Sequence, residues 1–456
     1  MLDCFNNFGD LEYLDLSNNL LDNFSDLSNL AKLIELRLSN NSINSLNSTN
    51  FGKLVSLVEI KVGGNVLNSL PNSFEESLVV SMDLSNNHLL NISVINWAKL
   101  SRLQYLFLGE NQFEELPLSI FQIPSLNLLN FTKTSVSEFP KIDASMNISS
   151  PLVSLVATKN YNFKEIPTNF CQFLPKLEIF FMARCNFSVF PIQLVNCSNL
   201  KLINLAYNDI QSISEEIKSL PPSFLSLNLK NNSLTEIPNL SFPDSSNRTL
   251  NVLDVSNNKI SSVTEDTFRN VSIYKFAIEG NSLKGWIPFP SSMTTVLAAY
   301  NELNDTLNLQ KIINNTGYAD FSSNSFSGEI DASHQLGYLN IVGNKQLNLS
   351  GIVFGYPETL FKKNNSLFKC FSPYSKIPYL FGNNPTSQSL ISSYKIDADP
   401  QNFNYSHCTC LKNYMVKKNC FFLHKLKINP KKIISIFKKK GNSTFLFSLS
   451  RYQPDV

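Results

Sequence analysis

The side chains best suited to chemistry, cysteine and histidine, gather near the carboxyl end of the chain. His407 precedes Cys408 and Cys410, and Cys420 and His424 follow. Thiolate and imidazole groups bind zinc, whereas cysteines can instead pair as disulfides. Because this C-x-C spacing is tighter than that of most zinc sites, we expect disulfides at Cys408, Cys410 and Cys420; a zinc site and unpaired thiols are the alternatives.

Elsewhere the sequence offers no constellation suited to catalysis. His88 and His334 lie far apart along the chain, and acidic pairs such as Glu75-Glu76 are neighbours in sequence outside the predicted strands. The sequence contains no G-x-S-x-G, P-loop, dinucleotide-binding, H-E-x-x-H or kinase signature. We therefore expect a protein that is not an enzyme, with no catalytic residues, no bound metal and no cofactor.

The elements that must position any functional residue are copies of the phrase L-x-x-L-x-L-x-x-N-x-L. Clear copies are Leu11–Leu21, Leu103–Phe113 and Leu250–Ile260, and fifteen copies follow one another with periods of 20–26 residues. The alternating L-x-L centre predicts a short strand with one buried face, and the flanking apolar residues would stack on the next copy. The asparagine position is occupied by Asn19, Asn41, Asn65, Asn87, Asn111, Thr134, Asn160, Cys185, Asn208, Asn232, Asn258, Asn281, Asn301, Asn324 and Asn344.

These copies closely resemble leucine-rich repeats over about three quarters of the chain. The resemblance implies an α/β solenoid, a horseshoe of about 15 repeats with a parallel β-sheet on its concave face and short irregular or 3-10 segments on its convex face. Leu283–Pro288 and Phe326–Ile330 look like the L-x-G-x-I-P turn of plant-type receptor ectodomains, although Asp331 stands where proline is expected. Thr134 and Cys185 can still donate a hydrogen bond in place of asparagine.

Composition divides the chain into four segments. We predict a solenoid over 1–350, an irregular cap over 351–395, a small cysteine-containing segment over 396–424 and a basic tail over 425–456. The C-x-C-x9-C spacing of the third segment resembles the closing half of an EGF-like module. Such a module needs six cysteines, and upstream lie only Cys370 and then none until Cys197. The net charge from residue 400 onward is +10 and that of the whole chain is +2, so the solenoid is mildly acidic.

The basic tail interleaves lysine with apolar residues. It could lie on an anionic membrane surface, or it could be a solvated tail. We do not expect nucleic-acid binding, because no recognised module accompanies the charge. Membrane association could also come from segments missing from this chain, because the first repeat begins almost at once and we expect the amino end to be incomplete.

Eighteen N-x-S/T sequons predict exposure to the secretory pathway, and an asparagine-rich coding bias is the alternative explanation. Neither a secretory signal nor a membrane-spanning apolar run is visible. We therefore expect an extracellular or cell-surface protein, with a cytoplasmic location as the alternative. Cys171, Cys185 and Cys197 lie in adjacent repeats and are expected to be buried free thiols. The predicted glycosylation sites include Asn23, Asn91, Asn130, Asn186, Asn270, Asn304, Asn348 and Asn404.

The third, fifth and seventh positions of each repeat should project from the concave sheet, and the third and fifth change character along the stack. At the amino end they are small or charged, as in Asp15, Glu35, Arg37, Glu59, Lys61 and Asp83. In repeats five to nine they form an apolar and aromatic set, which we call the concave strip: Tyr105, Phe107, Leu128, Val156, Ile179, Phe181 and Leu202. Beside it runs the eighth-position row of Glu110, Lys133, Lys159, Arg184 and Tyr207.

Exposed apolar residues edged by basic ones are typical of a binding surface. The alternative is irregular packing in which a neighbouring loop covers part of the strip. We predict ligand contact at Tyr105, Phe107, Lys133, Lys159, Phe181, Arg184 and Tyr207.

The resemblance and this surface together favour a module that binds a protein or peptide. We expect the ligand-recognition ectodomain, or a fragment of one, of a receptor or adhesion-type protein. An intracellular signalling scaffold and a secreted enzyme inhibitor are the alternatives.

Overall fold

The computed structural model describes residues 8–354 and 395–397, apart from 24, 144–145, 147, 241–247, 290–292, 309–317 and 333–337. The chain divides into two compact units, one of residues 1–356 with 376–402 and one of residues 357–375 with 403–456. The second unit lies outside the described residues. So do Cys408, Cys410, Cys420, His424 and Asn404, whose predicted roles stay predictions. The division of the chain into four segments stays a prediction as well.

Within the described residues, short strands stack into one parallel sheet of sixteen strands, and three further strands, β14, β16 and β18, form a second parallel sheet. In the larger sheet the strands of successive repeats pair with one another, for example Leu14 with Leu36 and Leu106 with Leu129, and the strand of the last repeat pairs with residues 395–397. The strands are β1 (Tyr13–Asp15), β2 (Glu35–Arg37), β3 (Glu59–Lys61), β4 (Ser81–Asp83), β5 (Tyr105–Phe107), β6 (Leu128–Asn130), β7 (Ser154–Val156), β8 (Ile179–Phe181), β9 (Leu202–Asn204), β10 (Ser226–Asn228), β11 (Arg248–Asp254), β12 (Val271–Ala277), β13 (Thr295–Leu297), β14 (Thr306–Asn308), β15 (Tyr318–Asp320), β16 (Ser327–Ala332), β17 (Tyr338–Asn340), β18 (Gln346–Phe354) and β19 (Lys395–Asp397).

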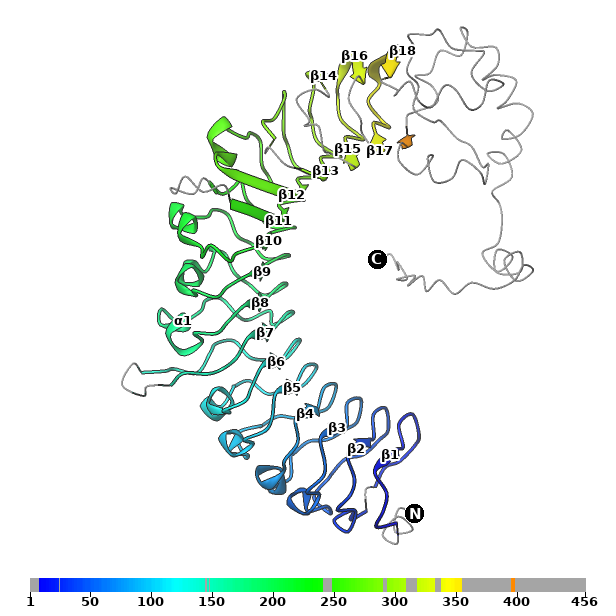
Figure 1. The fold of residues 1–456 in the computed structure, drawn as a ribbon, viewed down its shortest axis with the longest axis vertical. Coiled ribbons are helices and arrows are strands. Elements are labelled where there is room, and N and C mark those ends of the chain that lie inside the picture. The colour runs from blue at the N-terminus through cyan, green and yellow to red at the C-terminus, as the bar shows by residue number, and fades with distance from the viewer. Residues whose placement is uncertain are drawn as a thin grey trace, which may run out of the picture. The chain divides into compact units, whose positions relative to one another are not determined.

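The chain returns from each strand to the next through a short turn on the opposite side of the stack. Figure 1 shows the strands along the inner side of the curved stack of repeats and these turns along its outer side. The predicted solenoid is therefore confirmed, including its parallel concave sheet. The turns that adopt helical form are η2 (Phe51–Lys53), η3 (Asn72–Glu76), η4 (Trp97–Lys99), η5 (Leu118–Gln122), α1 (Phe170–Phe173), η7 (Ile192–Asn196), η8 (Glu215–Ser219) and η9 (Glu265–Phe268).

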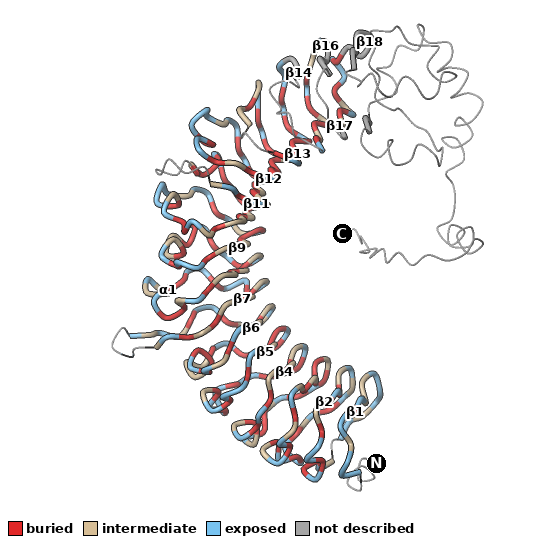
Figure 2. Tube along the Cα trace, viewed as in Figure 1, coloured by how far each residue is buried: buried red, intermediate tan, exposed pale blue. Residues whose placement is uncertain are grey.

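The core is a continuous layer between the sheet and the outer turns. The middle residue of each early strand points inward and is buried, as at Leu36, Ile60 and Leu106, because alternate residues of a strand face opposite sides. Figure 2 shows this buried layer running through the stack. Phenylalanines fill the layer behind the sheet; Phe139 packs against Phe170, with 5.0 Å between ring centroids. No repeat encloses its own core, so neighbouring repeats must fold together.

Where the asparagine position is occupied by asparagine, its side chain ties the turn of its own repeat to that of the preceding repeat. Asn65 donates through Nδ2 to the carbonyls of Val62 at 2.8 Å and Leu38 at 3.0 Å, and its Oδ1 accepts from the Ile43 amide at 3.0 Å. Thr134 keeps part of this pattern, because its hydroxyl lies 3.2 Å from the Phe131 carbonyl. Cys185 keeps only a weak version, with Sγ 3.4 Å from the Ala157 carbonyl. The expectation that both residues still donate agrees with these contacts.

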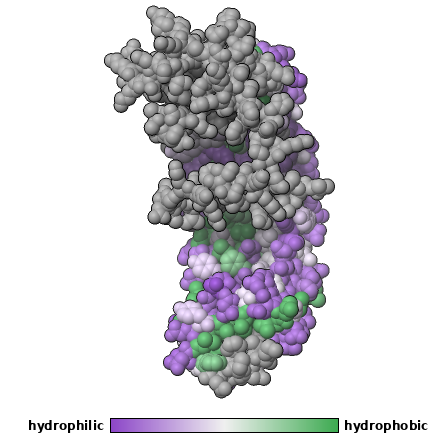
Figure 3. Space-filling view, turned by 90° about the vertical axis from the view of Figure 1, so that its right-hand side faces the viewer, coloured by the Kyte–Doolittle hydropathy of each residue, from purple (hydrophilic) through white to green (hydrophobic). Residues whose placement is uncertain are grey.

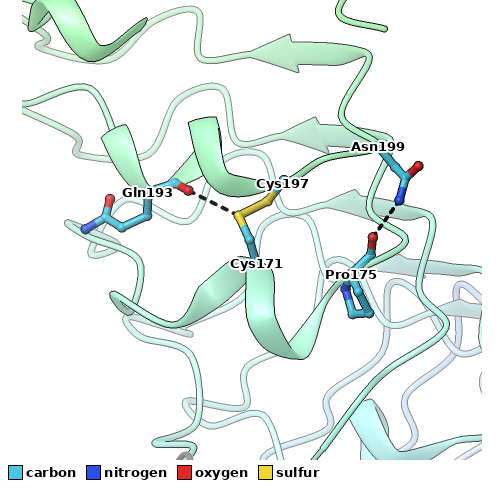
Figure 4. Close-up of a disulfide and its surroundings, with 5 residues drawn as sticks. All are labelled: Cys171, Pro175, Gln193, Cys197 and Asn199. Atoms are coloured by element: carbon cyan, nitrogen blue, oxygen red, sulfur yellow. Dashed lines mark hydrogen bonds between the residues drawn. A yellow bond between two sulfur atoms is a disulfide. The ribbon is translucent and has the colours of Figure 1, made fainter. Parts of the chain in front are cut away.

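Two of the three mid-chain cysteines are joined, which corrects the prediction of buried free thiols. Cys171 on α1 and Cys197, directly after η7, form a disulfide with Cα atoms 4.8 Å apart (Figure 4). The pair is buried, at 8% and 1% exposure, and joins adjacent repeats on the outer side of the stack. Only Cys185 is a buried free thiol among the described residues, and burial raises its pKa to about 12. The missed signal was the separation of 26 residues, about one repeat period.

Candidate functional site

The concave strip lies on the outward face of β5 to β9. Tyr105 is 39% exposed, and Phe107 and Phe181 are half-buried. In the parallel register the third strand positions run Phe107, Asn130, Val156, Phe181 and Asn204. Since neighbouring strands lie about 4.8 Å apart, Phe107 and Phe181 are roughly 14 Å apart along the stack. The strip is therefore a surface and not part of the core, and its aromatic rings are spaced along it instead of stacked.

The eighth-position row has an unusual backbone. In the fifteen repeats the residue before the asparagine position has a positive φ, from 51° to 85°. Left-handed backbone costs most L-residues roughly 1–2 kcal/mol, whereas glycine and asparagine adopt it readily. Most repeats accordingly have asparagine or glycine there. The exceptions are Tyr300, Ser323 and the residues of five consecutive repeats, Glu110, Lys133, Lys159, Arg184 and Tyr207.

This run of exceptions coincides with the concave strip. The fold itself fixes the backbone conformation of the eighth position, because the amide of this residue donates a hydrogen bond to the next repeat. Lys159 donates to the Ala183 carbonyl at 2.8 Å, and Arg184 donates to the Ala206 carbonyl at 2.9 Å. A large side chain in this slot is therefore held in strained backbone that asparagine would relax. Strain of this kind points to a selected role for the side chain.

The side chains of the row interact with one another only in part. Lys133 Nζ lies 2.9 Å from Glu110 Oε2, and this carboxylate raises the pKa of the Lys133 ammonium. Arg184 lies over the Tyr207 ring, with its guanidinium carbon 4.1 Å from the ring centroid. Lys159 is exposed and has no ion pair within the described residues. Arg184 and Lys159 therefore remain open to a ligand.

The amino-terminal part of the same face differs in kind. Its charges neutralise one another: Lys61 lies 2.8 Å from Glu59 and 4.0 Å from Glu35, and Arg37 pairs with Glu35 and, at 3.9 Å, with Asp15. Charges that are already paired within the protein contribute little to the binding of a charged partner.

The first repeat exposes apolar side chains at the edge of the stack. Phe8, Tyr13 and Leu20 are 55%, 62% and 94% exposed. Figure 3 shows apolar side chains gathered toward the lower end of the face that it presents, with hydrophilic groups above them. An end repeat has one uncovered face, so this exposure is expected of any solenoid. The concave strip, by contrast, lies on the sheet surface of the middle repeats, away from the ends of the stack, and is edged by cations.

Five predicted glycosylation sites are exposed, namely Asn23, Asn91, Asn186, Asn270 and Asn304. Asn130 differs, because it lies on β6 between Phe107 and Val156, within the concave strip. It is half-buried, and its Oδ1 accepts a hydrogen bond from the Thr132 amide at 2.9 Å. A glycan on Asn130 would cover the strip, so the predictions of a glycan there and of ligand contact beside it exclude each other.

Asn348 lies on β18, and its side chain is outside the described residues. The part of the chain that is described holds no group of three or more histidine, cysteine or acidic residues that could bind a metal ion. Its helices are all too short or too polar to cross a membrane.

The disulfide lies behind the strip. Cys171 belongs to the turn between β7 and β8, and Cys197 to the turn between β8 and β9. The same two turns are also joined by Asn199, whose Nδ2 donates to the Pro175 carbonyl at 2.8 Å (Figure 4). The outer turns before and after β8, the strand that carries Phe181, are thus joined by a disulfide and a hydrogen bond.

The fold is shared with proteins of known structure. No protein-family model matches the chain, and no curated protein matches it in sequence. Among solved structures it is similar to a leucine-rich-repeat protein of Leptospira interrogans, at 22% identity and a TM-score of 0.58, over 76% of this chain and 94% of that one. It is also similar to the leucine-rich-repeat ectodomain of the Arabidopsis thaliana membrane receptor kinase GASSHO1/SCHENGEN3, solved in complex with CASPARIAN STRIP INTEGRITY FACTOR 2, at 23% identity and a TM-score of 0.53 over 77% of this chain.

A third similar structure is the Toll–Spatzle complex of Drosophila, at 18% identity and a TM-score of 0.53 over 77% of this chain. The chain spans 43% of the plant receptor chain and 46% of the Drosophila one. The protein therefore has the leucine-rich-repeat fold. Among proteins with this fold, the structures that it resembles include plant receptor ectodomains.

Proposed function

We propose that this chain is a non-enzymatic leucine-rich-repeat module that binds a protein or peptide. Its ligand contacts the concave strip and the eighth-position row at Tyr105, Phe107, Lys133, Lys159, Phe181, Arg184 and Tyr207. The observation that carries the proposal is the run of five large or charged residues in left-handed backbone, beside the strip and nowhere else in such a run among the described repeats. Two of the structurally similar proteins were solved with protein or peptide partners, which is compatible with this class of ligand.

The module would act as the ligand-recognition ectodomain, or part of one, of a receptor or adhesion-type glycoprotein in signal transduction at a membrane. A buried disulfide supports this placement, because disulfides persist in oxidising compartments and are rare in the cytosol. The exposed sequons support it as well. An intracellular scaffold would instead keep Cys171 and Cys197 reduced. A secreted inhibitor would share both features and differ only in its partner.

Photocrosslinking tests the site while the ligand is still unidentified. Benzoylphenylalanine at position 105 replaces Tyr105 within the strip, and at position 13 it replaces Tyr13, an exposed tyrosine on the same sheet outside the strip. We expect covalent adducts with a protein or peptide from position 105 and none from position 13. Equal labelling at both positions would overturn the proposed site.

Substitution then tests the captured partner. Phe181→Ala with Arg184→Ala should weaken its binding by at least about tenfold, since aromatic and arginine side chains dominate such interfaces. The matched control is Tyr13→Ala with Arg37→Ala, which removes an aromatic and an arginine side chain from β1 and β2 and should leave binding unchanged. If the first variant unfolds, the strip is core and the assignment is wrong.

The location is tested by intact mass spectrometry of the protein from its own cells, with and without glycosidase. We expect a mass well above 51.4 kDa that falls on deglycosylation, with Asn130 unoccupied in the glycopeptide map. A mass at the polypeptide value would favour the intracellular scaffold. A glycan on Asn130 would leave the ectodomain proposal in place but move the ligand elsewhere.

A further inference from the structure

We infer that the ligand segment that binds this surface is acidic: a peptide stretch of a protein partner with an aspartate or glutamate beside an apolar side chain. The inference rests on the proposed function, because it names the partner chemistry of the same site. Its first support is the charge inventory of β5 to β9. At the third, fifth, seventh and eighth repeat positions of these five repeats, Glu110 is the one acidic residue, and its carboxylate is already paired with Lys133.

Two cations of the eighth-position row therefore have no carboxylate of their own. Lys159 has no ion pair within the described residues, and Arg184 contacts the Tyr207 ring and no acid among them. The amino-terminal part of the sheet provides an internal comparison. There Arg37 and Lys61 are both paired with carboxylates on their own or neighbouring strands. The fold can thus neutralise cations on this face, and beside the strip it does so at Lys133 but not at Lys159 or Arg184.

The two cations lie in adjacent repeats, so one short segment can reach both. The Lys159 amide donates to Ala183, the residue before Arg184, which places the two turns side by side. The strip next to them presents Val156 and Phe181 on paired strands. A ligand carboxylate would find two donors there, and an apolar neighbour in the ligand would find Phe181. Charge-assisted hydrogen bonds to such donors are stronger than neutral ones.

A polyanion such as nucleic acid fits this surface poorly. Phosphate backbones require many cations spread along the contact, and this surface offers two beside an apolar strip. The backbone of the eighth-position row is also held in place, because hydrogen bonds between neighbouring turns fix its conformation. The disulfide joins two of the outer turns behind it. The geometry therefore suits one acidic group and its apolar neighbour.

The probe for this inference is a displayed library of random peptides selected on the full-length glycosylated chain. We expect the selected peptides to be enriched in aspartate or glutamate within a residue or two of an aromatic or aliphatic side chain. Binding should weaken when sodium chloride rises from about 0.05 to about 0.5 M. Lys159→Asn and Arg184→Asn should each weaken the selected peptides by about tenfold.

Both substitutions are safe for folding, because asparagine occupies the same slot in other repeats, and neither creates a sequon. The matched control is Lys61→Asn, which removes a cation from β3 of the same sheet and should change nothing. Peptides that depend on Tyr105 and Phe181 but show no acidic preference would overturn this inference and leave the proposed function standing.

Peptides that ignore both the strip and the row would overturn the proposed function itself. Equal or tighter binding of a single-stranded oligonucleotide, lost in the same two variants, would replace the acidic peptide by a nucleic acid and would also refute the inference.

Discussion

Replacing Lys159 by asparagine should stabilise the solenoid, although it removes a side chain that we assign to ligand binding. Lys159 has a φ of 61°, and a left-handed backbone costs an ordinary residue roughly 1–2 kcal/mol. Asparagine tolerates this conformation, and Asn86 and Asn231 adopt it in the same slot. Because Lys159 has no ion pair within the described residues, the change removes no such interaction. We expect the free energy of unfolding to rise by about 1 kcal/mol.

Two further variants measure the size of the backbone strain at the eighth position. Arg184→Asn relieves the same strain but loses the contact with the Tyr207 ring, which is worth about 0.5–1 kcal/mol at an exposed site. Its net effect should therefore lie near zero. Asn86→Lys places lysine in a left-handed slot of an early repeat and should lower stability by about 1 kcal/mol.

Urea unfolding of the chain, treated with glycosidase beforehand, measures these differences. Fluorescence reports on the transition, because Trp97 is fully buried in the stack. We expect the midpoint to fall in the order Lys159→Asn, wild type, Asn86→Lys, with an unchanged slope. If Lys159→Asn destabilises the protein, or Asn86→Lys does not, the slot is not strained. The run of large residues would then be no sign of selected function.

Three further predictions concern groups away from the row. Cys171→Ala with Cys197→Ala should lower the free energy of unfolding by about 3–4 kcal/mol, because the disulfide closes a loop of 26 residues. A clearly smaller loss in urea unfolding would mean that the disulfide contributes little to the stability of these repeats. Cys185, whose pKa is raised to about 12, should resist iodoacetamide at pH 8 until the chain unfolds, and peptide mapping of labelled native protein checks this. Burial and the nearby Asp320 raise the pKa of Glu279, so its contribution to stability is present at low pH and lost as pH rises through that pKa. Glu279→Gln should therefore stabilise the chain at pH 7 and give no gain below about pH 4; an equal gain at both values contradicts the assignment.

The repeat phrase alone predicts the fold, because each of its recurring residues has a defined structural role. The leucines set the alternation of the strand, and the asparagine forms the ladder that Asn65 illustrates. The order and parallel pairing of the strands follow, since a stack of short repeats leaves few other arrangements. The outward positions of β5 to β9 follow as well, which is why the phrase alone places Tyr105 and Phe181 on the sheet.

Two features could not be predicted in the same way. The left-handed backbone of the eighth position depends on hydrogen bonds between turns, such as that from Lys159 to Ala183, and a lysine in the sequence gives no hint of it. The disulfide depends on where two outer turns meet in space. The spacing of Cys171 and Cys197 by about one repeat hinted at the pairing, but only the stacked turns bring the sulfurs together.

The eighth position also has a consequence for how such a surface can change over generations. Its side chain points away from the core, so a substitution there leaves the packing of the stack intact. An asparagine codon becomes a lysine or a tyrosine codon by one base change, and each repeat offers one such position. The row from Glu110 to Tyr207 can thus be rewritten one repeat at a time. A gene built of duplicated repeats could exchange one partner for another by a few point mutations, each tolerated by the fold.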